Sequence, residues 1–160
     1  MAINPSPQNR RRLTAAVGAG CCAVLLAYVP QFEGVILRGY SDPIGIVTAC
    51  AGHTATAILG KPYSKEECET LLVDDLVDHA EGVDGCTKDL TTGQRAAAIS
   101  FAFNVGVAKF CGSTFARRLN AHDAGACMEL DRWTRAGGEI MTGLVKRRAA
   151  ERAICEGRMA

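Results

Sequence analysis

The chain has 160 residues, of which 48% are hydrophobic and 22% are charged. This length and balance are typical of one globular domain and exclude a disordered or collagen-like chain. The net charge of +1 argues against a dedicated nucleic-acid-binding protein, because such proteins need a clustered basic face. We therefore expect no nucleic-acid partner.

The N-terminal segment combines a basic start with an apolar run. Arg10, Arg11 and Arg12 are followed by residues 13–32, which carry no charge. As a helix, the apolar part at residues 13–29 would be about 25 Å long, just short of a hydrocarbon core of about 30 Å. Few of its side chains are large, so insertion into a bilayer gains only about 2–4 kcal/mol. The run is predicted to enter a membrane and to be held there weakly.

Three interpretations of this segment compete. A cleaved signal peptide fits the basic start, but no small-x-small cleavage site follows the run. A buried N-terminal helix of a soluble protein is the second. An uncleaved signal anchor is favoured, with the arginines in the cytoplasm and the rest of the chain exported by the positive-inside rule. We expect residues 1–30 to form the basic segment and the anchor, and residues 31–160 to form the exported domain.

The exported part begins with turn-rich sequence and continues with helical patterns. Glycines at 39, 45 and 52 break up residues 39–60, which predicts short strands with tight turns. Capping boxes at residues 64–67 and 91–94 each predict the start of a helix. Asn120 and Asp123 are expected to be caps around a break in the helical pattern. Further helices are expected at residues 126–133, ended by Gly137-Gly138, and at residues 140–156. The pattern indicates an α+β protein with a small sheet lobe and a larger helical lobe.

Eight cysteines are many for a protein of a reducing compartment. They form no Cys-x-x-Cys motif, which disfavours a zinc site and favours disulfides in an oxidising compartment, so we expect no metal. Six lie in the exported part, in agreement with the signal anchor. Cys21 and Cys22 lie in the apolar run. They are either small apolar filler or switch thiols, exposed on release to a redox step that could involve Cys50.

Two carboxylates and a hydroxyl follow the apolar run. Glu33 comes directly after Phe32, where partial desolvation favours the protonated carboxyl that a general acid needs. Asp42 lies in a predicted turn whose backbone amides can keep a carboxylate ionised, and Thr48 adds a neutral hydroxyl that can hold water. Two carboxyl groups in opposite protonation states are suited to the hydrolysis of a glycosidic bond.

At these residues the sequence resembles a known family. Glu33-x8-Asp42-x5-Thr48, continuing to Gly52-His53, is similar to the T4-type phage lysozymes, glycoside hydrolase family 24. The resemblance covers residues 32–156 and includes, in order, 94–106, 112–114, 118–120, 133–138 and 143–151. It implies an α+β, lysozyme-like fold of the T4 type, with a small β-sheet lobe and a larger helical lobe. The N-terminal apolar signal-anchor helix adds a likeness to the signal-arrest-release (SAR) endolysins of this family.

The resemblance implies a muramidase that hydrolyses the β-1,4 bond between N-acetylmuramic acid and N-acetylglucosamine in peptidoglycan, without a cofactor. Glu33 would be the general acid, Asp42 the second carboxylate and Thr48 the group that places water or substrate. T4-like enzymes invert configuration, which would make Asp42 a base or an orienting group. The implied supporting residues are His53, which would brace its turn, Asn104, and Arg147 and Arg148. One of these arginines would pair with Glu33; alternatively they form a solvated basic face.

The SAR likeness also implies partners and a location. The chain would be held inactive in the host inner membrane by residues 13–29 and then released to the periplasm as a monomer, in partnership with a holin or pinholin and with spanins. The alternative is a catalytically idle peptidoglycan-binding or lysis-regulating relative. Relatives tend to have cysteines at the positions of 50, 68, 127 and 155, and Cys86 and Cys111 look like an additional couple. We therefore expect three disulfides: Cys50–Cys68, Cys86–Cys111 and Cys127–Cys155. The family motif Thr-x-Gly-x-Gly-His is broken here, because Cys50 replaces its first glycine.

Overall fold

The computed structural model describes residues 3–158 of the chain. These residues form two compact units, one ending at Asp78 and the other beginning at His79. We call them the N-terminal unit and the C-terminal unit. Helix α3 (Lys65–Cys86) starts in the first and ends in the second.

The N-terminal unit begins with two helices, α1 (Pro7–Val17) and α2 (Ala19–Glu33). Gly18 separates them with φ 84° and ψ 158°, a backbone conformation that essentially only glycine adopts. The sequence predicted one helix over residues 13–29, and the structure instead bends it by 118° at this point. Within residues 3–158, no single helix is long and apolar enough to cross a membrane. By length and composition the bent pair α1–α2 passes that test.

The bend allows the apolar run to be buried against protein. Buried residues lie on both sides of Gly18, in α1 and in α2. They are Leu13, Val17, Cys21, Cys22, Val24, Leu25 and Val29. Removing apolar surface from water is favourable by roughly 25 cal/mol per Å². Burial in the protein therefore gives the run the kind of stabilisation that a bilayer would otherwise give it.

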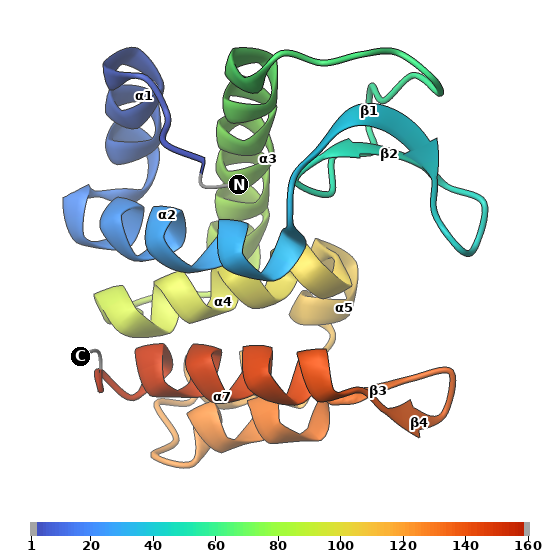
Figure 1. Cartoon of the computed structure of the whole chain (residues 1–160). Helices are drawn as coiled ribbons and strands as arrows, with labels where there is room; N and C mark the ends of the chain where they lie inside the picture. The colour runs from blue at the N-terminus through green and yellow to red at the C-terminus, as the bar shows by residue number, and fades with distance from the viewer. Residues whose placement is uncertain (1–2, 159–160) are drawn as a thin grey trace. The chain divides into compact units, whose positions relative to one another are not determined.

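The sheet of this unit is a short hairpin, β1 (Ile36–Ser41) and β2 (Val47–Cys50), as the turn-rich sequence predicted (Figure 1). The strands are antiparallel, with Tyr40 opposite Thr48. The segment that follows closes on β1 through Gly39, whose N–H donates to the carbonyl of Lys61 at 2.9 Å. A Cβ at position 39 would lie 1.9 Å from the carbonyl oxygen of Ile58, so only glycine fits there.

Helix α3 begins where the capping box predicted. The backbone N–H of Glu67 donates to Ser64 Oγ at 3.1 Å, and the N–H of Ser64 donates to Glu67 Oε2 at 2.7 Å. These two bonds satisfy amides that a helix start otherwise leaves without partners. Cys68 on the first turn joins Ala49, Cys50 and Tyr63 in a small core beneath the hairpin.

The C-terminal unit is helical and is built around aromatic side chains. Phe101 contacts Phe115 and Trp133 edge to face, with ring centroids 5.7 and 5.0 Å apart. The predicted capping box of Thr91 and Gln94 is present at the start of α4. The elements are α4 (Thr92–Val105), α5 (Val107–Cys111), α6 (Thr114–Asn120), a 3-10 helix η1 (Ala126–Arg132), β3 (Arg135–Ala136), β4 (Glu139–Ile140) and α7 (Thr142–Cys155).

Several details of this unit differ from the sequence prediction. Residues 126–132 form a 3-10 helix, and Gly137-Gly138 is the turn of the two-residue hairpin β3–β4. Asn120 does not cap a following helix: its side chain donates to the carbonyl of Cys86 and accepts from the N–H of Lys88. Asp123 Oδ1 accepts from the N–H of Gly125 in a local turn. Short polar side chains compete for nearby backbone groups in this way.

Three disulfides are present, one in the N-terminal unit and two in the C-terminal unit. They are Cys50–Cys68, Cys86–Cys111 and Cys127–Cys155, the three pairs that the sequence analysis expects. They close segments of 18, 25 and 28 residues. In the chain-entropy model each disulfide stabilises the folded protein by about 3 kcal/mol. Cys127–Cys155 ties the start of η1 to the end of α7.

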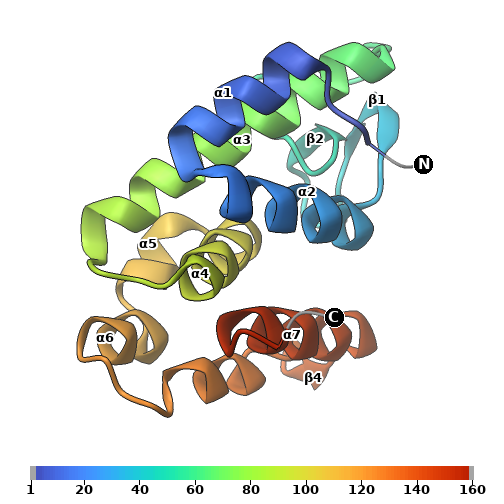
Figure 2. The same cartoon turned by 90° about the vertical axis from the view of Figure 1, so that its left-hand side faces the viewer.

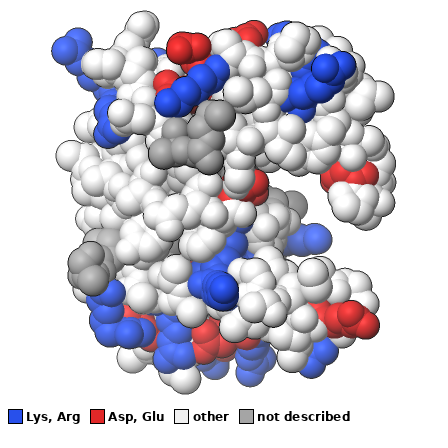
Figure 3. All heavy atoms as spheres, viewed as in Figure 1, with Lys and Arg blue, Asp and Glu red and all other residues white. Residues whose placement is uncertain are grey.

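Charged side chains of opposite sign are intermingled on the C-terminal unit. Arg152 bonds to both Asp131 and Glu156, and Arg118 lies 3.1 Å from Glu129. Arg152 and then Arg158 hold the pKa of Glu156 below its ordinary value. Over the segment that contains η1 and α7, Figure 3 shows basic and acidic atoms alternating rather than a patch of one sign.

Candidate active site

Glu33 is the last residue of α2, and the helix ends there because Gly34 adopts a φ of 67°. The turn after β2 lies against its carboxylate. A Cβ added at Gly52 would lie 3.1 Å from Glu33 Oε2, and Gly52 has a φ of 82°. The glycine thus provides both the turn and the space that the carboxylate occupies. The family motif contains this glycine, and the structure gives the physical reason for it.

Asp42 lies in the turn between β1 and β2. Its Oδ1 accepts hydrogen bonds from the backbone N–H groups of Ile44, at 3.0 Å, and Ile46, at 2.8 Å. Its own N–H donates to the carbonyl of Ile46 at 2.9 Å. The side chain is half-buried and fixed in orientation, because the two amides hold one of its oxygens.

Thr48 stands on β2, between the turn of Asp42 and the turn that contacts Glu33. It is buried, and its hydroxyl donates to the carbonyl of Ile46 at 3.2 Å. All three predicted catalytic residues therefore belong to the N-terminal unit and are set around one hairpin. Asp42 precedes β2, Thr48 lies on it, and Glu33 contacts the turn that follows it.

His53 anchors that second turn to α3. Its Nδ1 lies 2.9 Å from Asp75 Oδ2, and its Nε2 accepts from the backbone N–H of Thr56 at 3.1 Å. Because Nε2 acts as an acceptor, the ring is the tautomer whose Nδ1–H donates to Asp75. The sequence indicated a bracing role for His53 but missed Asp75 and Thr56, which carry no recognisable motif.

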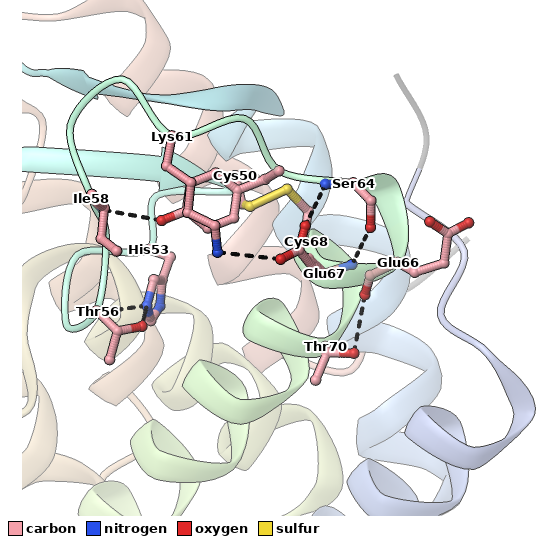
Figure 4. Close-up of polar contacts among 11 residues, drawn as sticks. Cys50, His53, Thr56, Ile58, Lys61, Ser64, Glu66, Glu67, Cys68 and Thr70 are labelled. Carbon is pink, nitrogen blue, oxygen red and sulfur yellow. Dashed lines mark hydrogen bonds and ion pairs between the residues drawn. A yellow bond between two sulfur atoms is a disulfide. The ribbon is translucent and has the colours of Figure 1, made fainter.

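The segment after His53 is held by a chain of polar contacts (Figure 4). The N–H of Ile58 donates to the hydroxyl of Tyr63 at 3.0 Å, and Lys61 lies 3.3 Å from Glu67. The N–H of Ser64 and then Lys61 hold the pKa of Glu67 below its ordinary value. A pocket of about 380 Å³ opens here, and two of its lining side chains, Lys61 and Glu67, are paired with each other. The contacts serve to fix the segment on α3.

Cys50 occupies the position of the lost family glycine and keeps the backbone conformation of a glycine, with a φ of 56°. Its side chain is bonded to Cys68 on α3. The disulfide therefore ties the turn next to Glu33 to the same helix that His53 contacts. The two switch candidates, Cys21 and Cys22, are buried on α2.

The remaining expected site residues, Asn104, Arg147 and Arg148, take part in a buried ionic network in the C-terminal unit. Glu151 is fully buried and accepts from Arg147 Nε at 3.0 Å, Arg148 Nη1 at 2.5 Å and Ser100 Oγ at 2.7 Å. Arg148 also donates to Asn104 Oδ1 and to the carbonyl of Trp133. Both arginines are buried, so the alternative of a solvated basic face is wrong. The sequence matched Glu151 without revealing its role, although its spacing from the arginines was a signal.

The Glu151→Gln variant is expected to lose about 3–5 kcal/mol of unfolding free energy. Glutamine keeps the size of the side chain but removes the carboxylate charge that Arg147 and Arg148 contact, and breaking a buried pair in this way is costly. Guanidinium unfolding of the purified protein measures the loss. Glu139→Gln on exposed β4 is the matched control, and equal stability of the two variants would contradict the network's role.

Comparison with known proteins agrees with this fold. Residues 30–151 match the model of the phage lysozyme family. The chain is 40% identical over 158 residues to the SAR-endolysin of Enterobacteria phage P21, covering 93% of this chain and 96% of that protein. It is 38% identical over 159 residues to the SAR-endolysin of Bacteriophage PS119, covering 94% and 95%.

Among solved structures, the active form of the P1 phage endolysin Lyz has the same fold. Its TM-score is 0.76 at 20% identity, covering 97% of this chain and 95% of that one. Fold and family together define a lysozyme-type glycoside hydrolase. The chain belongs to the phage lysozyme family, as the resemblance of its motifs predicted.

Proposed function

We propose that the chain is an endolysin whose catalytic residues are Glu33, Asp42 and Thr48. It hydrolyses the β-1,4 bond between N-acetylmuramic acid and N-acetylglucosamine of peptidoglycan and so causes lysis of the bacterial host. The observation that carries the assignment is the placement of two carboxylates and a hydroxyl around one hairpin, with Glu33 against the Gly52 turn.

In this mechanism Glu33 protonates the glycosidic oxygen as the bond to the leaving sugar breaks. Asp42 accepts a proton from the attacking water, whose hydroxyl adds to the anomeric carbon. The two amides on Asp42 Oδ1 orient its carboxylate for this step. Thr48 positions the water or the substrate. The roles of Asn104, Arg147 and Arg148 are supporting, because they hold the buried network of the C-terminal unit.

Analysis of the digestion products tests the proposed reaction. Purified protein is incubated with peptidoglycan, and the new reducing ends are reduced with borohydride and identified by mass spectrometry. We expect reduced N-acetylmuramic acid at the new ends. Reduced N-acetylglucosamine or anhydromuramic acid would instead indicate a glucosaminidase or a transglycosylase. NMR of the first anomer released tests inversion separately.

The proposal includes a membrane-tethered state before release. Residues 13–29 lie in the host inner membrane, with Arg10–Arg12 in the cytoplasm and residues 31–160 in the periplasm. The SAR-endolysin relatives, the basic start of the chain and the weakly apolar run support this topology. Glu33 ends the same helix that contains most of the run, so its final position depends on the run having left the bilayer.

Leaving the bilayer costs the run only about 2–4 kcal/mol, the free energy that insertion gains. Collapse of the membrane potential removes a force that keeps the three arginines in the cytoplasm. We further propose that the released enzyme acts as a monomer on peptidoglycan, after a holin or pinholin and together with spanins. The endolysin relatives support this order of events.

A further inference from the structure

Helix α1 lies beside the first half of α3, as both views of the ribbon show (Figures 1 and 2). Polar groups join the two helices. Asn9 Nδ2 donates to Thr70 Oγ1 at 3.0 Å, and Arg12 Nη2 lies 2.6 Å from Asp74 Oδ1. Ahead of the helix, the N–H of Asn4 donates to Glu69 Oε1 at 3.2 Å. We call Glu69, Thr70 and Asp74 the acceptor face of α3.

The contact is specific because Asn9 is buried. Asn9 is 9% exposed, and its amide is bonded at both ends: it donates to Thr70 and accepts from Arg12 Nη1 at 3.3 Å. A buried amide costs free energy unless such bonds are made. Leu13 and Val17 follow at intervals of one helical turn and are also buried. One stripe of α1 therefore combines a polar contact with α3 and the start of the apolar run.

These contacts are incompatible with the membrane-tethered state. With residues 13–29 in the bilayer and Arg10–Arg12 in the cytoplasm, about 30 Å of hydrocarbon would separate Asn9 and Arg12 from α3. An interaction that exists in only one of two states shifts the equilibrium toward that state. The acceptor face can therefore act only on the released form.

Resting on the proposed release from the membrane, we propose that the acceptor face of α3 is a docking site for the basic N-terminal helix. Docking locks the released state and opposes reinsertion of the run. It follows that the arginines themselves cross the bilayer and end on the same side as α3. The N-terminal arginines thus have two successive roles: they set the orientation of the anchor, and Arg12 then fastens the helix to Asp74.

Vesicle binding by the full-length protein tests the lock. The probe is a vesicle of phosphatidylethanolamine and phosphatidylglycerol, and sedimentation measures the bound fraction. Thr70→Val leaves the Asn9 amide without its acceptor, and we expect the bound-to-free ratio to rise about ten-fold. Asp74→Asn removes an exposed ion pair, and we expect a rise of about two- to five-fold. Both changes lie outside the membrane segment.

Asp78→Asn, at an exposed position on α3 one turn beyond Asp74, is the matched control and should bind as the wild type does. In an Asn9→Leu background, Thr70→Val should have no further effect, because the hydrogen bond is already absent. Equal binding by wild type and both lock variants would overturn the proposal, as would a rise in Asp78→Asn equal to that in Thr70→Val. Muramidase activity of the wild type on isolated peptidoglycan, measured in parallel, reports separately on the proposed function.

Discussion

The Glu33→Gln variant is expected to lose lytic activity by about 10²- to 10⁴-fold while unfolding at the wild-type temperature. Glutamine has the shape of glutamate and fits the same space beside Gly52, but it cannot deliver a proton to the glycosidic oxygen. The decline in turbidity of permeabilised Gram-negative cells measures activity. Because the substitution preserves volume, a loss of activity without a loss of stability points to the proton.

Asp42→Asn separates the two carboxylate roles. Asparagine can still accept the two amide bonds through its Oδ1, so the turn should persist while the negative charge disappears. We expect a loss of activity similar to that of Glu33→Gln, and a smaller loss in Thr48→Ala. Wild-type rates of lysis by Glu33→Gln would contradict the assignment and favour a relative that does not use these residues.

Features determined by local chemistry were predictable from the sequence. Both capping boxes, Ser64–Glu67 and Thr91–Gln94, are two-residue signals with an immediate physical cause, and both helices start where they predicted. The hairpin around Asp42 is likewise set by its turn residues. The catalytic residues became recognisable because each lies next to such a local feature: a helix end, a turn or a short strand.

Features determined by tertiary packing were not predictable. Helices α5 and α6 have only 5 and 7 residues, too few for a periodic pattern to emerge. Asp75 is one acidic residue among several on α3, and only the fold brings it to His53. The burial of Arg147 and Arg148 depends on Glu151, whose spacing of four and three residues hinted at ion pairs but not at a buried network.

The bend at Gly18 is the clearest case, because the same residues suit two structures. By composition, residues 13–29 are a marginal membrane helix. In the structure they are the end of α1, a glycine and most of α2. Small residues lower the gain from insertion and also let the helices pack on protein. The sequence shows this balance, but the place of the bend depends on which side chains the fold buries.

Leucine substitutions at Gly18 and Gly20 are expected to give unequal delays of lysis. Each adds the same side chain to the run and so strengthens insertion to a similar degree. Only Gly18→Leu also opposes the bent form, because Gly18 has φ 84° and ψ 158° whereas Gly20 lies inside α2. Space is not the obstacle, since a Cβ at Gly18 meets no atom within 4 Å. The backbone alone should disfavour the released state by about 1–3 kcal/mol, roughly a factor of 5 to 150.

Fractionation of induced cells measures the ratio of membrane-bound to periplasmic protein, and the time of lysis measures its consequence. Gly20→Leu is the matched control for hydrophobicity, so the additional retention of Gly18→Leu reports on the bend. Equal retention by the two full-length variants would mean that release requires no bend at Gly18. Lysis on the wild-type schedule by a fully membrane-bound Gly18→Leu protein would mean that release is not the switch.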